Sequence, residues 1–241
     1  MRTLTMLAAA AVFLSPAAAS AQAALRVQPL SVDVVSPSQA SAITLQNNGP
    51  EVVSVQLRVF EWTQVDGQDR FLPTNDVVAS PPVARIAPGS NYTIRIARTV
   101  GAAAAGAEKS YRLWVDELPP ALPSRDEGGE VDVRLRFDLP VFFHAANAEP
   151  KVTWRAHKVG DDVVLEATNT GSGHARIQGL ELHGGSSEVS FGEGLNGYVL
   201  ANSTRRWTAP AGSANVLGSG RTTVVTGVGD SETSQVVALA D

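Results

Sequence analysis

The most regular pattern along the chain is an alternation of apolar and charged residues in "VDVRLRFDLPVFF", residues 131–143. Successive side chains of an extended strand point to opposite faces. Five apolar residues therefore share one face: Val131, Val133, Leu135, Phe137 and Leu139. The pattern predicts a long strand. Alternation alone is typical of a strand half-buried on its own core, whereas the same residues left exposed would form a patch large enough to bind a partner.

Shorter runs of β-type residues predict further strands on both sides of this stretch. Before it they are Leu25–Val35, Ser41–Gln46, Val52–Trp62, Asn91–Arg98 and Ser110–Leu118. After it they are weaker, at Lys151–Val159, Asp162–Thr168, Ala175–His183, Tyr198–Leu200, Arg205–Thr208 and Arg221–Val228. Turn sequences such as "NNGP" and "APGS" separate the runs, helical periodicity is nearly absent, and the alanine-rich segment 101–108 is expected to be a loop. These signals predict antiparallel β-sandwiches.

The small-residue stretch "HAANAEP", residues 144–150, has the composition of a hinge between compact units. The strand series on its two sides do not repeat each other. We therefore expect two all-β sandwich domains, over residues 24–145 and 146–241, both of ordinary domain size.

The first 23 residues have the pattern of a cleaved export signal. Arg2 precedes an apolar run through Leu14, and small residues lead to Ala21-Gln22-Ala23. No later segment approaches the roughly 20 apolar residues of a membrane-spanning helix. The mature chain is therefore expected to be exported and soluble. Because it has no cysteine, its stability cannot depend on disulfides.

Charge and motifs argue against nucleic-acid binding and against catalysis. The net charge is −5, with no basic run. "GEGLNG" (192–197) has dinucleotide-loop spacing but is followed by strand and turn residues. The four histidines lack metal-ligand spacing, and no G-x-S-x-G serine motif or placed carboxylate pair occurs. The sequence therefore indicates a binding protein, with no cofactor, metal or catalytic residue.

Three features of the sequence are not required for a β-sandwich to fold. The strand over 131–143 is the longest and most strictly alternating, and the loop-like "LPSRDEGGE" precedes it. Arg95, Arg98 and Arg112 fall on neighbouring candidate strands, where arginines are suited to carboxylate recognition. An exported chain without catalytic motifs also suggests a protein partner.

An ordered set of motifs resembles one family. In the first half they are "LRVQPLSVDVVSPSQASAITLQNNG", "VSVQLRVFEW", "VVASPPVARIAPGSNYTIRIAR", "EKSYRLWVDELPP" and "RLRFDLPVFFHA". In the second half they are "LEATNTGSGHARIQGLEL" and "GYVLANSTRRW". The chain is similar in this order to the periplasmic pilus-assembly chaperones of the chaperone–usher pathway, the PapD-like proteins. "DLPVFF" resembles the L-P-x-F form of the archaic branch of that family.

The resemblance implies two immunoglobulin-like domains arranged as a boomerang in the periplasm. It implies that Val131 to Leu139 is a donor strand, lent to a pilin subunit whose own sandwich lacks its last strand. The partners would be pilin subunits, in one-to-one complexes, and an outer-membrane usher. A free chaperone with an apolar edge strand is also able to self-associate.

The sequence departs from the family where the subunit's C-terminal carboxylate is held. The classical branch has an arginine in the first strand and a lysine near the end of the last one, and an ungapped placement puts Ser31 and Pro140 at these positions. Neither binds a carboxylate by charge. We therefore expect Arg112, assisted by Arg95 or Arg98, to supply the anchor through its planar fork. A secreted immunoglobulin-like adhesin or structural module that lends no strand is the alternative.

Overall fold

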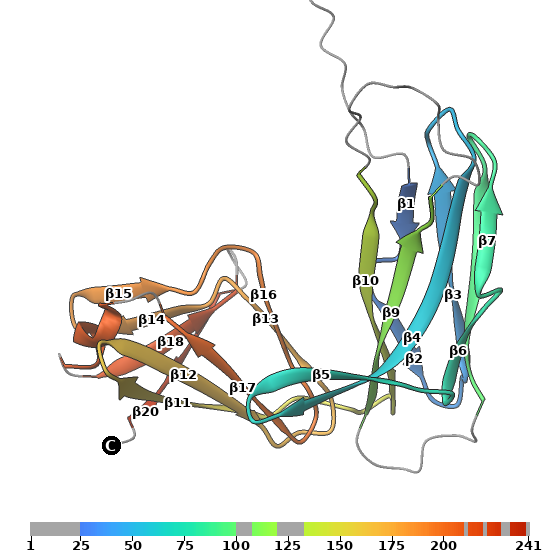
Figure 1. Cartoon of the computed structure of the whole chain (residues 1–241). Helices are drawn as coiled ribbons and strands as arrows, with labels where there is room; N and C mark the ends of the chain where they lie inside the picture. Colours follow the sequence, from blue (N-terminus) through green and yellow to red (C-terminus); the bar gives the residue numbers. More distant parts are fainter. Residues whose placement is uncertain are drawn as a thin grey trace, which may run out of the picture.

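The structure, a computed structural model, describes residues 25–99, 108–119, 133–209, 212–218, 221–227 and 232–239. The expected export signal, the loop over 101–107 and Val131 lie outside the described residues. Within them the chain is built from strands, with one short 3₁₀ helix, η1 (Ser213–Leu217). None of the described helical residues forms a segment long and apolar enough to cross a membrane. Figure 1 shows two β domains joined at an angle, and the predicted fold class is confirmed.

The first domain is a sandwich of two sheets. One sheet has the order β1 (Leu25–Gln28), β3 (Ala40–Asn47), β8 (Asn91–Arg98) and β6 (Val77–Ser80). The other has the order β2 (Val32–Val35), β10 (Arg136–His144), β9 (Lys109–Glu117), β4 (Val53–Val65) and β5 (Gln68–Pro73), with β7 (Val83–Ile86) also paired to β4. Alternate residues of both sheets meet in the core, as Leu113 and Val115 of β9 do against Ile94 of β8.

The predicted strand Leu25–Val35 is in fact two strands in different sheets. β1 pairs antiparallel with β3, whereas β2 runs parallel to β10. The break falls at Pro29, whose ring removes the backbone N–H that a continuous ladder needs. The short strands β5, β6 and β7 were not predicted, because runs of four to six residues carry little periodic signal.

The second domain has three sheets. The first contains β17 (Ser203–Thr208), β12 (Asp162–Asn169), β11 (Val152–Val159) and β20 (Ala238–Leu239). The second pairs β13 (Ala175–Gln178) with β16 (Leu195–Val199). The third contains β15 (Ser187–Ser190), β14 (Glu181–Gly184), β18 (Thr222–Thr226) and β19 (Thr233–Val236). Trp154, Leu165 and Leu182 lie in its separate core.

Two glycine-rich stretches of the second domain explain local differences from the prediction. The expected strand Ala175–His183 divides into β13 and β14 at Gly179, whose φ of 56° does not continue a strand. "GEGLNG" leads into β16 and not into a helix. Gly192 to Gly194 precede the strand, whereas Leu195 to Gly197 belong to β16, so the predicted turn covers only the first half of the motif.

Candidate functional site

The outer edge of β10 is free over part of its length. β9 pairs with β10 from Arg136 to Phe143. On the opposite edge, β2 pairs only with the stretch from Val141 to His144. Among the described residues, no strand therefore pairs with the outer edge from Arg136 to Pro140. The N–H and C=O groups of such an edge are a template for a strand from another chain.

The apolar residues along this edge change from exposed to buried toward the hinge. Val133 is 72% exposed, Leu135 and Phe137 are half-buried, and Leu139 is 3% exposed. Leu139 packs in the first domain's own core. The strand also begins at Arg136, five residues later than expected from the alternation. The alternation predicted one uniform apolar face. In the structure this face is exposed at Val133 and becomes part of this chain's own core at Leu139.

Arg112 lies in the same cross-strand row as the two departures from the family pattern. Pro140 of β10 is directly opposite Arg112 of β9. Ser31 immediately precedes Val32, which pairs with Val141, the residue after Pro140. The row of residues at the Pro140 end of the free edge, its inner end, therefore runs from Ser31 through Pro140 to Arg112.

The Arg112 guanidinium contacts Trp62 and Asp138 but still has an N–H without a hydrogen-bond partner among the described residues. Its Cζ lies 3.8 Å from the centroid of the Trp62 ring, and its Nη1 lies 3.5 Å from a carboxylate oxygen of Asp138. The side chain is 14% exposed, and its buried Nε has no hydrogen-bond partner among the described residues. Burial lowers the pKa of Arg112, with Asp138 and Asp69 acting in the opposite direction. The group remains a cation with a free donor.

The structure does not bring Arg95 and Arg98 to this row. Both are on β8, which belongs to the other sheet of the sandwich. Arg95 is exposed, and the Arg98 guanidinium lies 5.6 Å from the ring centroid of Phe143. β8 and β9 follow each other in sequence but cross between sheets, so the expected cluster of three arginines on adjacent strands is not formed.

Aromatic side chains from both domains form the junction between them. Trp62 of β4 and Phe142 of β10 pack with Tyr198 and Leu200 of the second domain. The His174 ring stacks on Phe142 and its Nδ1 lies 2.8 Å from a carboxylate oxygen of Glu108. Sequence reasoning missed this contact because the paired residues lie far apart in the chain.

The hairpin formed by β4 and β5 reaches across to the second domain (Figure 1). At its tip, the Arg206 N–H donates to the carbonyl oxygen of Gly67 at 3.0 Å. Arg205 forms an ion pair with Asp69. Burial raises the pKa of Asp69, but hydrogen bonds from Arg205, Gln64 and Trp62 outweigh it, and the net pKa is below the ordinary value.

The comparisons with known proteins identify the family. Residues 24–148 match the family described as "Pili and flagellar-assembly chaperone, PapD N-terminal domain". The chain belongs to this PapD family. The resemblance found from the ordered motifs is confirmed. The curated proteins compared with the chain include no match.

Solved structures of PapD-like chaperones match nearly the whole chain. One is the CsuC–CsuE chaperone–tip adhesion subunit pre-assembly complex from archaic chaperone–usher Csu pili of Acinetobacter baumannii, with 26% identity, a TM-score of 0.69, and coverage of 90% of this chain and 99% of that one. The periplasmic chaperone SfaE has 13% identity and a TM-score of 0.57, covering 89% and 99%. The Salmonella enterica SafA pilin complex with the SafB chaperone has 16% identity and a TM-score of 0.57, covering 88% and 95%.

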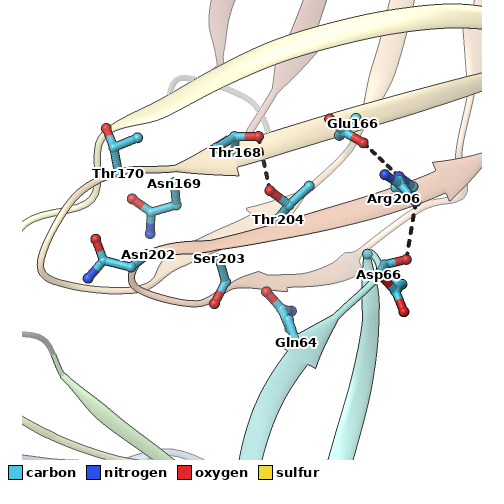
Figure 2. Close-up of a pocket in the computed structure, with 11 residues that line it drawn as sticks. Gln64, Asp66, Glu166, Thr168, Asn169, Thr170, Asn202, Ser203, Thr204 and Arg206 are labelled. Carbon is cyan, nitrogen blue, oxygen red and sulfur yellow. Dashed lines mark hydrogen bonds and ion pairs between the residues drawn. The ribbon is translucent and has the colours of Figure 1, made fainter.

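Figure 2 shows a hollow between the tip of the β4–β5 hairpin and strands of the second domain. Its volume is about 410 Å³. Polar side chains from both domains line it. The Thr168 and Thr204 hydroxyls lie 3.1 Å apart, Arg206 pairs with Glu166 at 2.6 Å, and Arg206 also donates to the Asp66 carbonyl oxygen. The hollow belongs to the junction between the domains, because its lining residues come from the hairpin of the first domain and from strands and turns of the second.

Proposed function

We propose that this protein is a periplasmic chaperone that binds pilin subunits one-to-one by donor-strand complementation and delivers them to an outer-membrane usher. In this proposal residues 1–23 are a cleaved export signal, and residues 24–145 and 146–241 are the two domains. The observation that carries it is the unpaired edge of β10 from Arg136 to Pro140, in a chain of the PapD family. The CsuC–CsuE and SafB–SafA complexes, each named as a chaperone with its subunit, support the choice of partner.

The donor segment would include Val131, Val133, Leu135 and Phe137. Val133 is exposed and Leu135 is half-buried, so these side chains are available to fill the groove that a subunit's missing strand leaves, while the backbone edge pairs with the subunit's strand. Phe137 is half-buried against this chain's own core and would present only its outer part. Val131 is included from its place in the alternation, since it lies outside the described residues. The Leu139 side chain packs in this chain's own core, so Leu139 would contribute only backbone hydrogen bonds to the subunit's strand.

The inner end of the edge supports Arg112 as the carboxylate anchor. β2 occupies the outer edge of β10 from Val141 onward and runs parallel to β10. A subunit strand that adds to the edge in the same direction must end before Ser31, the residue that precedes β2. Its last residue then arrives at the row of Arg112. Arg95 and Arg98 are on the other sheet, so the proposal assigns the anchor to Arg112 without them.

Periplasmic co-expression with each small secreted protein encoded beside the gene tests the proposal. The wild type should co-purify with a subunit in a one-to-one complex by mass. Leu135→Glu should capture none, because a carboxylate would enter an apolar groove, and should still unfold cooperatively. Val159→Glu, which changes an exposed apolar residue of the second domain, is the matched control and should retain capture. Capture by Leu135→Glu at wild-type yield would exclude this edge, and no capture by the wild type would favour an adhesin or structural module.

A further inference from the structure

The charged residues of the alternating stretch pair with strand β9. Arg136 of β10 lies directly opposite Asp116 of β9, and the two side chains form an ion pair. Asp116 also accepts hydrogen bonds from Nε and Nη2 of Arg58 on β4, at 3.2 and 2.7 Å. One carboxylate therefore links three neighbouring strands, β10, β9 and β4. Burial raises the pKa of Asp116, but hydrogen bonds from Arg136 and Arg58 outweigh it, and the net pKa is below the ordinary value.

Two further ion pairs lie on either side of this one. On the side away from the hinge, the Arg134 Nη1 lies 3.8 Å from a carboxylate oxygen of Glu117, whose backbone N–H donates to the Leu135 carbonyl oxygen at 3.0 Å. On the hinge side, Asp138 lies 3.5 Å from Arg112. The described charged residues of the stretch therefore all meet an opposite charge on β9.

The Trp114 ring restrains the two arginines that share Asp116. Trp114 of β9 is opposite Arg58 of β4 in the strand register. The Cζ atoms of Arg136 and Arg58 lie 4.5 and 5.4 Å from the centroid of its ring, within the range of a cation–π contact. An isolated surface ion pair contributes little, whereas charges that form a network with restrained side chains contribute more. The three strands are therefore linked by a network and not by a single pair.

The exposed half of the donor segment depends on these contacts, because its apolar face has little of this chain to pack on. Val133 is 72% exposed and Leu135 is half-buried, whereas Leu139 lies in the core. Among the described strands, β9 alone pairs with β10 from Arg136 to Pro140. Side chains of adjacent residues point to opposite faces, so the charged residues bind β9 without occupying the apolar face.

We propose that Arg136, Asp116 and Arg58 are positioning residues for donor-strand complementation, which hold the exposed half of the donor segment against β9 before a subunit arrives. The inference rests on the proposed function. One face of the segment is left free for the subunit's groove, while the opposite face is bound to the chaperone's own sheet. Because the segment is ordered in advance, its ordering does not oppose binding. The ion pairs therefore raise the rate of capture and not the lifetime of the complex.

Amide hydrogen exchange in the free mature protein, followed by NMR, tests whether the network holds the segment. The reporter is the Glu117 N–H, which bonds to the Leu135 carbonyl oxygen. The reference is the Asn47 N–H, which bonds to the Ser90 carbonyl oxygen at 3.0 Å in the other sheet. The variants are Arg136→Gln, Arg136→Lys, Asp116→Asn, the double variant Arg136→Gln with Asp116→Asn, and the control Arg26→Gln, which changes an exposed arginine of β1. The Arg136 side chain is 51% exposed, so its replacement should leave the fold intact, and thermal unfolding checks this.

The rate of capture is measured on the same proteins. The subunit that co-purifies with the wild type is released in guanidinium chloride and diluted into each chaperone, and the complex formed with time is quantified by size-exclusion chromatography. The lifetime of each complex is measured by transfer of its subunit to an excess of tagged wild-type chaperone.

We expect Arg136→Gln and Asp116→Asn each to speed exchange of the Glu117 N–H about 3- to 10-fold relative to Asn47, between the effects of a lone surface ion pair and of a buried charged hydrogen bond. The double variant should add little, because both changes remove one interaction. Arg136→Lys keeps the cation and should recover part of the loss. Complex formation should slow about two- to fivefold, because only the ordered fraction of the free protein captures a subunit. The lifetime of the complex should not change, and Arg26→Gln should match the wild type throughout.

Two results would reject this inference and leave the proposed function standing. Unchanged Glu117 exchange in both single variants would mean that the ion pairs do not hold the segment. Faster exchange with an unchanged rate of capture would mean that they stabilise the sheet without positioning the donor segment. If the wild type captures no subunit, the proposed function and the inference are both wrong.

Discussion

The imidazole ring of His174 lies flat on the phenyl ring of Phe142, with centroids 3.6 Å apart and ring planes 11° apart. Phe142 belongs to β10, the strand that carries the free edge, and His174 immediately precedes β13 of the second domain. The same imidazole bonds to Glu108, whose side chain is 1% exposed. This stack and the packing of Phe142 against Tyr198 join the strand of the free edge to the second domain.

We expect His174→Ala to lower the free energy of unfolding by about 1–3 kcal/mol, because it removes the partner of the buried Glu108 Oε2, while the Ser110 hydroxyl still donates to Oε1. Glu108→Gln in the same background should cost less than it does alone, since the interaction is already lost. Urea denaturation of the four proteins of this double-mutant cycle measures the coupling. Strictly additive losses would mean that the pair contributes nothing of its own.

Gly67 at the tip of the β4–β5 hairpin allows contact with Arg206. Its φ is +77°, and a Cβ added there would lie 2.6 Å from the Cγ of Arg206. Gly89 has a similar φ of +67° but open space around it. Gly89→Ala should therefore cost only the backbone strain, about 1 kcal/mol, whereas Gly67→Ala should cost more and loosen the domain junction. Denaturation midpoints compare the two.

The Arg206→Ala variant is the control for the expected clash between the added Cβ at residue 67 and the Arg206 side chain. The Arg206→Ala background removes the two nearest atoms, Cγ and Cδ, and leaves the Cβ of residue 206 at 3.0 Å from the added atom. The excess cost of Gly67→Ala over Gly89→Ala should then shrink. An unchanged excess would mean that the clash with Arg206 is not its cause.

Local patterns predicted the strands, but not how they meet. The runs at 91–98 and 110–118 are close to β8 and β9 as observed, yet their residues do not reveal that the chain crosses to the other sheet between them. Arg95 and Arg98 were therefore grouped with Arg112 wrongly. Likewise, nothing in "VDVRLRFDLPVFF" indicates that Leu139 meets this chain's core while Val133 does not. That difference depends on which part of the stretch lies over the first domain's core, which is set by long-range packing.

The junction between domains illustrates the same limit. The Asp69–Arg205 and Glu108–His174 contacts join residues separated by 136 and 66 positions. No sequence pattern predicts either pair, because each residue is a common type for the strand or turn in which it lies. A family motif includes His174, but only the structure shows that its ring lies against Phe142 and Glu108 of the first domain.

Acid should weaken the domain junction through Asp69. Its pKa in the folded protein is below the ordinary value, so the unfolded chain binds this proton more readily. The stabilisation by Asp69 is fully present above the unfolded pKa of about 3.9 and is lost as the pH falls through the lower folded pKa. The difference in melting temperature between the wild type and Asp69→Asn should therefore shrink below about pH 4. The exposed Asp161→Asn serves as the control, and a difference that is independent of pH would contradict the assignment.

The two ends of the apolar stretch should respond oppositely to truncation. Leu139→Ala removes a side chain from the first domain's core and should cost about 2–5 kcal/mol of unfolding free energy. Val133→Ala changes a side chain that is 72% exposed and should alter stability by no more than about 0.5 kcal/mol. At a temperature where both variants are folded, the order should reverse in subunit capture. Val133→Ala should reduce the yield, because in the proposed complex the Val133 methyl groups would fill the subunit's groove. Leu139→Ala should retain it, because its side chain never leaves this chain's core. If Val133→Ala captured subunit normally and Leu139→Ala did not, the donor segment would have to lie nearer the hinge.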